Sequence, residues 1–475
     1  MSFKKVFVKN ILVSGGYTYL SQAISFFSTI IISRYLDPES YGFVGIITIF
    51  IRFLTVFSDS GISLAIIRSD FLYTYHKSVD TLALLVGLVL CALTCLLAFP
   101  VSLFFHMPGL RLPMMVMSLS FIFKSMTLVR GALITKEMDF RFAGYVTLLT
   151  SVFTVIATIF MAYWGAGYWA LVIPQTFSGL VTLILLEKKT RFKFHLYSWA
   201  HIRVSFRHTR KTIGNLMGFN MVNYWSRNLD NLMVGKMYGA GDLGIYNRAY
   251  NLLAFPLTLI TGLITTVLYP SLNKIKHSAE AVRAEYLSIL RLLGFISFPV
   301  SCILLLFGHQ LVYLMWGESW MAVAKLLPYF GLLLLSQSLS STFGNILVLL
   351  KKEKVLRING WLSAVAVISG IVYGAFHSLL AIAQFYSLAF IVLVLPLNVF
   401  YVFVYAMKFP LKTMLQFWVP NILLSLGIWF SCYYNMEQAK LLLLLAFSLS
   451  MVLNARTELL KILQLLKDRL KKQIS

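Results

Sequence analysis

Charged and hydroxyl side chains share one face of a long apolar stretch in this chain. Within residues 41–67 the polar positions recur every three or four residues, at Thr48, Arg52, Thr55, Asp59 and Ser63. At 100° per residue they form a narrow stripe on a helix that is otherwise mostly apolar. An ionisable side chain at the centre of a bilayer costs about 2.5–3.5 kcal/mol, so this stripe should face protein or water. Arg52 is therefore a candidate for binding an anion, and Asp59 a candidate for coupling to an ion.

A second polar face lies in the stretch 213–236. It carries amide, phenol and charged groups at helical spacing: Asn220, Asn223, Tyr224, Arg227, Asp230 and Asn231. Amide and phenol groups can form hydrogen bonds with sugar hydroxyls. Arg227 and Asp230 are three residues apart, so they could instead form a structural pair that neutralises itself and lets the helix insert. Both interpretations stay open at this point, and Asp230 is the second candidate for ion coupling.

A third cation, Lys124, stands in the middle of the stretch 112–134, beside Ser120 and Thr127. Three arginines lie nearer the ends of their stretches, where a long side chain can reach the membrane interface: Arg130, Arg248 and Arg291. We expect a cationic cavity that contains Arg52, Lys124 and Arg227, with Arg130 and Arg248 at its margin. Guanidinium groups bind phosphate and carboxylate through two hydrogen bonds, so the natural passenger of such a cavity is an anion.

The elements that position these residues follow from composition. Of 475 residues, 59% are apolar and only 12% are charged, with a mean hydropathy of +0.81. Soluble domains carry about 45–50% apolar and about 25% charged residues, so this chain is a polytopic membrane protein. Apolar stretches predict fourteen transmembrane helices, near 11–33, 41–67, 79–105, 112–134, 143–164, 166–186, 213–236, 244–270, 286–308, 322–350, 355–376, 379–404, 413–434 and 439–454.

Lysine and arginine gather on one side of this predicted topology. With the N-terminus in the cytoplasm, thirty of the 41 basic residues fall on the cytoplasmic side and five on the other. Such a bias favours cytoplasmic N- and C-termini and an even number of helices. The net charge of +24 is thus interpreted as loops held against an anionic membrane surface, not as a nucleic-acid site.

An internal repeat divides the chain. The segment 34–42 (RYLDPESYG) resembles 236–244 (KMYGAGDLG), an offset of 202 residues and six helices. Two copies with the same orientation predict an all-α fold of two parallel six-helix lobes around a central cavity, with two extra C-terminal helices. The expected domains are an N-lobe (1–186), a basic cytoplasmic linker (187–212), a C-lobe (213–404), helices 13 and 14 (405–454) and a basic amphipathic tail (455–475). Linker and tail are expected to contact membrane lipids.

Neither a catalytic residue nor a metal site is expected. The predicted outer loops are short, and their acids are scattered, one or two to a loop. The chain lacks the paired-histidine, G-x-S-x-G and P-loop motifs of common enzymes. A membrane glycosyltransferase or polysaccharide polymerase is therefore a weak alternative to a transporter.

Five motifs, in order along the chain, resemble a known family. They are the segments 34–42 (RYLDPESYG), 57–63 (FSDSGIS), 226–235 (SRNLDNLMVG), 244–250 (GIYNRAY) and 317–320 (GESW). This pattern is similar to the polysaccharide transport branch of the MOP exporter superfamily, in particular to Wzx-type flippases of the colanic-acid and teichuronic-acid exporter-like group.

The resemblance implies a flippase in the bacterial inner membrane. It would move an undecaprenyl-diphosphate-linked oligosaccharide to the periplasmic leaflet by alternating access, for O-antigen, capsule or exopolysaccharide assembly. The partners it implies are this lipid-linked oligosaccharide and other polysaccharide assembly proteins. No cofactor is implied beyond an H⁺ or Na⁺ gradient. A multidrug or other small-solute exporter of the same superfamily is the alternative, as is a major-facilitator protein, although the loop 68–77 lacks the Gly- and Arg-rich signature of the latter.

Overall fold

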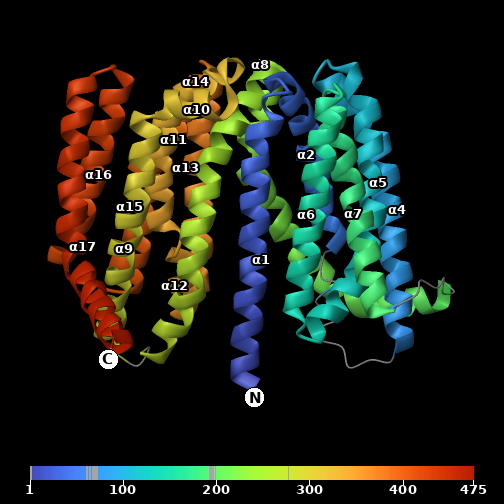
Figure 1. The fold of residues 1–475 in the computed structure, drawn as a ribbon, viewed down its shortest axis with the longest axis horizontal. Helices are drawn as coiled ribbons and strands as arrows, with labels where there is room; N and C mark the ends of the chain where they lie inside the picture. The colour runs from blue at the N-terminus through green and yellow to red at the C-terminus, as the bar shows by residue number, and fades with distance from the viewer. Residues whose placement is uncertain are drawn as a thin grey trace. The chain divides into compact units, whose positions relative to one another are not determined.

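The chain folds into helices that group into two compact units, residues 1–245 (unit 1) and 246–475 (unit 2). The structure is a computed structural model that describes residues 3–59, 63, 66, 73–191, 197, 199–275 and 278–474. In these ranges every regular element is a helix (Figure 1). The prediction of an all-α fold is confirmed, whereas the domain boundaries expected from sequence stay a prediction.

Unit 1 is a bundle of long helices. Its elements are α1 (Phe3–Ile32), α2 (Pro38–Asp59), α4 (Tyr73–Phe104), η1 (Pro108–Leu110), α5 (Arg111–Lys136), α6 (Phe140–Tyr163), α7 (Trp169–Thr190) and the first part of α8 (Trp199–Lys274). Within the bundle, α4 and α7 both pack against α5, and α1 packs against α6. In Figure 1, α4, α5 and α7 run side by side.

Local sequence sets where these helices begin. Before α2, the Asp37 carboxylate accepts a hydrogen bond of 2.9 Å from the Ser40 amide, and Pro38 occupies the first helical position. Before α6, the Asp139 carboxylate accepts one of 3.1 Å from the Phe142 amide. Both are N-caps, which satisfy amide groups that have no partner in the first helical turn.

Helix α8 is broken at one residue. Gly239 has φ 87° and ψ −174°, while the residues on both sides are helical. This backbone region is open essentially to glycine alone. The sequence predicted a turn over 236–244 between two helices. In the structure the helix is interrupted only at Gly239.

Unit 2 contains the rest of α8 and the C-terminal helices. These are α9 (Ala279–Leu306), α10 (Gly308–Trp316), η2 (Glu318–Trp320), α11 (Ala322–Ser340), α12 (Phe343–Leu349), α13 (Glu353–Ala375), α14 (Leu379–Ala389), η3 (Phe390–Val394), α15 (Leu395–Val399), η4 (Phe400–Ala406), α16 (Leu411–Tyr433) and α17 (Glu437–Ile474). An apolar core of this unit lies among α8, α9, α12, α15, η4 and α16. Helices α16 and α17 pack against each other and lie side by side in Figure 1.

One membrane helix of unit 2 is locally widened. The continuous stretch 379–406 contains two π-helical segments, η3 and η4, and Asn398 lies between them in α15. The Asn359 amide on α13 donates a hydrogen bond of 2.6 Å to the Asn398 side-chain oxygen, and both residues are buried. A buried amide must find such a partner, so this bond fixes α13 against α15.

Eleven helices in the described ranges are long and apolar enough to cross a membrane. They coincide with eleven of the fourteen predicted stretches, and the other three lie within α1 and α8. Large apolar side chains on these helices are exposed, including Leu96, Leu423 and Leu442. Such a surface is compatible with lipid, so the protein is a multi-pass membrane protein.

The break in α8 leads to a test of stability. We expect Gly239→Ala to lower the thermal stability of the purified protein, because a residue with a Cβ in this backbone region costs about 1–3 kcal/mol. The measurement is the temperature at which half of the protein in detergent loses its monodisperse peak in size-exclusion chromatography.

Gly131→Ala is the matched control, since Gly131 lies inside α5 and has open space where a Cβ would stand. This change should leave the temperature equal or slightly higher. Equal losses in the two variants would contradict our account of Gly239.

Candidate functional site

Three of the residues singled out from sequence come together in unit 1. Arg52 is exposed on α2, and Lys124 is half-buried on α5. Lys124 lies close enough to Arg52 for the two positive charges to interact. The charge of Arg52 also acts on the hydroxyl of Tyr224, which comes from α8. Two cations and a phenol from three different helices thus form one group, called here the cation group.

Tyr224 joins α8 to α2 beside this group. Its hydroxyl donates a hydrogen bond to the Ile49 carbonyl oxygen, three residues before Arg52. The Phe53 ring lies 5.7 Å from the ring of Tyr224 and 5.0 Å from that of Trp225, centroid to centroid. The position of Arg52 relative to α8 is therefore set by a hydrogen bond and by aromatic packing.

The hydroxyl residues of the predicted stripes serve their own helices. The Thr55 hydroxyl donates to the Ile51 carbonyl at 2.8 Å, and the Thr127 hydroxyl donates to the Lys124 carbonyl at 2.7 Å. Back-bonding of this kind is usual for threonine within a helix. The threonine hydroxyls are therefore used within their own helices. The longer charged side chains on the same polar faces extend beyond the helix backbone.

The pair Arg227 and Asp230 does not form the ion pair that the alternative interpretation requires. Among the described residues, no ion pair within 4.0 Å joins them. Arg227 is exposed, whereas Asp230 is buried and accepts hydrogen bonds from the backbone and side-chain amides of Asn231, at 2.8 and 3.2 Å. Arg227 is consequently available on the surface of α8, and Asn231 is used to hold Asp230.

Three predicted site residues cannot be placed. The side chains of Asp59, Asn220 and Asn223 lie outside the described part of the chain, so their roles stay predictions.

Arg248 lies in unit 2, where it is buried beside two neighbouring indole rings. Its guanidinium carbon is 5.3 Å from the centroids of both Trp316 and Trp320, and only 3% of the residue is exposed. Cation–π contacts stabilise a desolvated arginine by about 2 kcal/mol or more. The expectation that Arg248 reaches the interface is wrong: it is buried against the two indole rings of the W-G-E-S-W segment.

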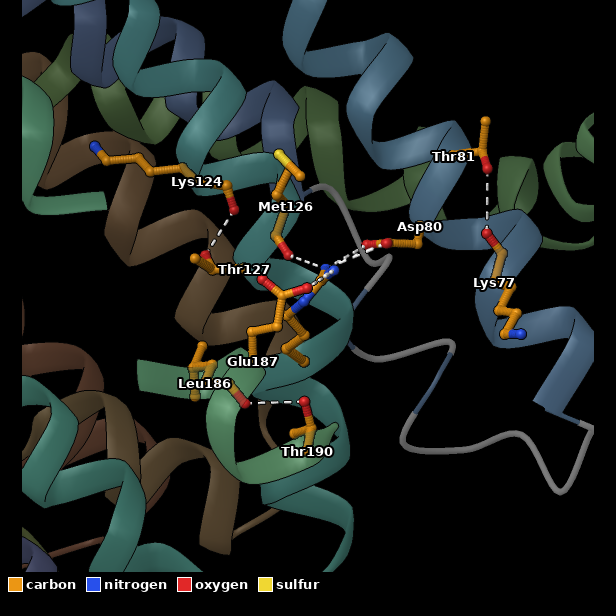
Figure 2. Close-up of polar contacts among 10 residues, drawn as sticks. Lys77, Asp80, Thr81, Lys124, Met126, Thr127, Leu186, Glu187 and Thr190 are labelled. Atoms are coloured by element: carbon orange, nitrogen blue, oxygen red, sulfur yellow. Dashed lines mark hydrogen bonds and ion pairs between the residues drawn. The ribbon is translucent and has the colours of Figure 1, made fainter. Parts of the chain in front are cut away.

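Sequence reasoning missed an ionic cluster in unit 1 (Figure 2). Arg130 on α5 is fully buried, and one of its nitrogens lies 3.0 Å from a carboxylate oxygen of Asp80 on α4, which is 1% exposed. A second nitrogen lies 3.8 Å from Glu187 on α7. The first nitrogen also donates to the Met126 carbonyl oxygen. The expectation that Arg130 snorkels to the interface is therefore wrong as well.

This ionic cluster, Asp80, Arg130 and Glu187, joins three helix ends. Asp80 is near the start of α4, while Arg130 and Glu187 are near the ends of α5 and α7. Lys124 and Arg130 both lie on α5, and Figure 2 shows the Lys124 side chain directed away from Asp80. The ionic cluster and the cation group are thus separate, although both draw on α5.

Two neighbouring contacts tie further segments to this end of unit 1. The Tyr197 amide, in the predicted linker, donates a hydrogen bond of 3.3 Å to the Thr81 hydroxyl next to Asp80. Lys189 on α7 lies 3.4 Å from the Asp139 carboxylate that caps α6. The sequence did contain a signal: Asp80, Arg130 and Glu187 lie within or next to the ends of predicted apolar stretches, all on the same predicted side of the membrane. The sequence does not reveal which of these helix ends are neighbours.

The ionic cluster leads to a prediction about stability. Arg130→Ala would leave the Asp80 carboxylate buried without its arginine, and loss of one partner from a buried pair costs about 3–5 kcal/mol. We expect a strong loss of folded protein, measured as the amount of monodisperse protein after detergent extraction and its melting temperature.

Lys189→Ala is the control, because it removes one partner of a half-exposed pair. Exposed pairs contribute about 0–1 kcal/mol, so this variant should resemble the parent. A melting temperature that falls equally in both variants would show that burial is not what makes Arg130 important.

The chain is similar to proteins of polysaccharide biosynthesis. A family model described as "Polysaccharide biosynthesis protein" matches residues 31–325. The chain belongs to this family. The lipopolysaccharide biosynthesis protein WzxC of Escherichia coli (strain K12) is 24% identical over 328 residues, which make up 67% of this chain and 65% of that protein. The resemblance drawn from the five motifs is thereby confirmed.

Solved structures support the same fold. The lipid II flippase MurJ, in an inward closed conformation, matches 94% of this chain and 100% of its own with a TM-score of 0.70 at 15% identity. A multidrug resistance MATE family transporter of the MOP superfamily, in an inward-facing conformation, matches 80% of this chain and 94% of its own with a TM-score of 0.58, also at 15% identity. The expected MOP-like architecture is confirmed.

Proposed function

We propose that this protein is a flippase that moves an undecaprenyl-diphosphate-linked oligosaccharide across the bacterial inner membrane by alternating access. The observation that carries the proposal is the cation group. Arg52 and Lys124 come from two apolar helices and lie close enough to repel each other. Such an arrangement is costly in an apolar bundle unless an anion binds there.

A diphosphate headgroup suits the cation group. Arg52 offers a planar fork that can bind two phosphate oxygens, and Lys124 offers a compact point charge for a further oxygen. Tyr224 and Trp225 supply aromatic surface beside them, and exposed Arg227 adds a cation on the same helix. A cationic drug would be repelled by this group, which favours a lipid-linked anionic substrate over the multidrug alternative.

The family and its named relatives support the pathway. The match to a polysaccharide biosynthesis family and the likeness to WzxC suit a step in surface polysaccharide assembly. Proteins that polymerise or export the glycan are the expected partners. The charge bias of the loops favours cytoplasmic termini, so the substrate would enter from the cytoplasmic leaflet.

An ion gradient would drive the cycle. Asp230 is buried beside Asn231 on α8, and Asp59 follows Arg52 on α2. A carboxylate that changes its proton or Na⁺ occupancy during transport would alter the charge near the substrate cations. We therefore assign ion coupling by H⁺ or Na⁺ to these two residues as part of the proposal.

The cation group is tested by substitution. Arg52→Ala and Lys124→Ala should each lower translocation of a fluorescent lipid-linked oligosaccharide in proteoliposomes by at least about tenfold, the equivalent of 1.4 kcal/mol of lost binding. Arg52→Lys should retain part of the activity, because a point charge replaces only part of the two-oxygen contact.

Lys325→Ala removes an exposed cation from the start of α11 and serves as the control. It should translocate like the parent. If Arg52→Ala also kept the parental rate with the purified substrate, the cation group would not be the headgroup site.

A second experiment separates the two roles of Arg227. If Arg227 binds substrate, Arg227→Ala abolishes export in a complementation assay, and adding Asp230→Ala does not restore it. If Arg227 only neutralises Asp230, the double variant exports like the parent. We expect the first outcome, since the structure holds Asp230 through Asn231 and leaves Arg227 exposed.

A further inference from the structure

Two glycines that occupy the same place in the two repeat copies touch each other in unit 1. A Cβ built on Gly42 of α2 would lie 1.6 Å from the Ala240 carbonyl oxygen and 2.8 Å from the Gly244 nitrogen. A Cβ built on Gly244 of α8 would lie 1.9 Å from the Pro38 carbonyl oxygen and 3.1 Å from the Gly42 nitrogen. No side chain fits at either position while the two backbones stay in place.

These contacts are reciprocal under the repeat. At the repeat offset of 202 residues, Pro38 is equivalent to Ala240 and Gly42 is equivalent to Gly244. Each glycine therefore meets the residue that lies four positions before the other glycine. The start of α2 and the segment of α8 after Gly239 consequently cross on a local two-fold axis, which is the geometry of a self-complementary contact. We call these four residues the glycine crossing.

The glycine crossing is held by weak forces. Each carbonyl oxygen lies in the direction in which a glycine Cα–H bond points, because that hydrogen replaces the missing Cβ. Cα–H···O contacts contribute about 0.5–1 kcal/mol each. Contacts of this strength between the two backbones can be broken at small cost at the crossing itself, where no side chain stands between the two glycines.

A dry layer lies directly beside the crossing. Ile46, Phe105 and Leu243 are buried, and their side chains come within 3.2–3.4 Å of the position that a Cβ on Gly235 would take. Ile46 is one helical turn after Gly42, and Leu243 precedes Gly244. The crossing and this layer therefore form a continuous seal at one end of α2.

The cation group is farther along the same helix. Arg52 follows Gly42 by ten residues, which is about 15 Å along an α-helix. The charge bias of the loops places residues 34–42 and 236–244 on the side opposite to the termini. The seal thus stands between the cation group and the outer side.

We propose that the glycine crossing is the outer gate of the transport path, closed in this structure and opened when the headgroup leaves outward. This inference rests on the proposed flippase function for its purpose but not for its test. With glycine at both positions, the backbones of α2 and α8 can come into direct contact and close the gate. A larger residue at either position would keep the two backbones apart. Gly42→Ala or Gly244→Ala should then shift the protein toward states with the crossing separated.

The test reports exposure of the dry layer. In a chain whose four native cysteines are replaced by alanine, Leu243→Cys is labelled with a membrane-impermeant maleimide added to the outer side of spheroplasts. We expect slow labelling with both glycines present. Adding Gly42→Ala or Gly244→Ala should raise the labelling rate about tenfold, which corresponds to a shift of 1.4 kcal/mol in the gate equilibrium.

Two controls separate gating from a general steric effect. Gly241→Ala lies beside the crossing but has open space where the Cβ would stand, so it should not change labelling. Gly374→Ala lies on α13, where its Cβ would be 2.6 Å from the Ala381 carbonyl oxygen. That variant is equally tight but outside the crossing, so it should lower the melting temperature without raising labelling.

Unchanged labelling in the Gly42 and Gly244 variants, with a lower melting temperature, would overturn the gate and show static packing. If those variants are not recovered in the membrane, Leu243→Cys is labelled in the chain with both glycines, in cells that make or lack lipid-linked glycan. Faster labelling with the glycan supports the gate, and equally slow labelling in both overturns it. If labelling of Leu243→Cys rises in the glycine variants but the parent protein does not translocate the lipid-linked oligosaccharide, the gate is supported and the flippase function is refuted.

Discussion

The constraint on which this structure depends is the cost of placing charge inside an apolar helix bundle. Within each helix the backbone N–H and C=O groups form hydrogen bonds with one another. Only polar side chains are then left without a partner inside the bundle, and each buried charge needs one. Three solutions occur. Arg130 is paired with carboxylates, Arg248 is buried beside two indoles, and Asp230 accepts hydrogen bonds from the amides of Asn231. Half-buried Lys124 instead lies within range of a second positive charge, that of exposed Arg52, which is why the two stand out as a site for an anionic ligand.

These solutions assign different tasks to residues of the same type. The ionic cluster fixes the ends of α4, α5 and α7, so that α5 can present Lys124 from a rigid helix. The contacts of Arg248 with Trp316 and Trp320 stabilise the W-G-E-S-W turn in unit 2. A rigid support of this kind is needed around a group of like charges, because their repulsion would otherwise be relieved by movement of the helices.

Apolar stretches in the sequence predicted an all-helical fold with fourteen membrane helices, eleven of which match helices long and apolar enough to cross a membrane in the described ranges. Periodicity predicted the polar faces that carry Arg52 and Tyr224. Periodicity describes one helix at a time, however. It could not reveal that Asp80, Arg130 and Glu187 meet, since their contact depends on which helices are neighbours. Similarly, the offset of 202 residues identified the repeat, but the meeting of Gly42 and Gly244 arises only when both copies fold together.

The reciprocal contact at these glycines has a consequence for the origin of the chain. A surface that pairs with its own copy would join two separate molecules just as well as two halves of one. A protein of half this length could thus have formed the same contact across a homodimer, and duplication with fusion of its gene would preserve it within one polypeptide. Fusion would also free the two halves to diverge, so that Pro38 in one copy could become Ala240 in the other while both glycines were kept.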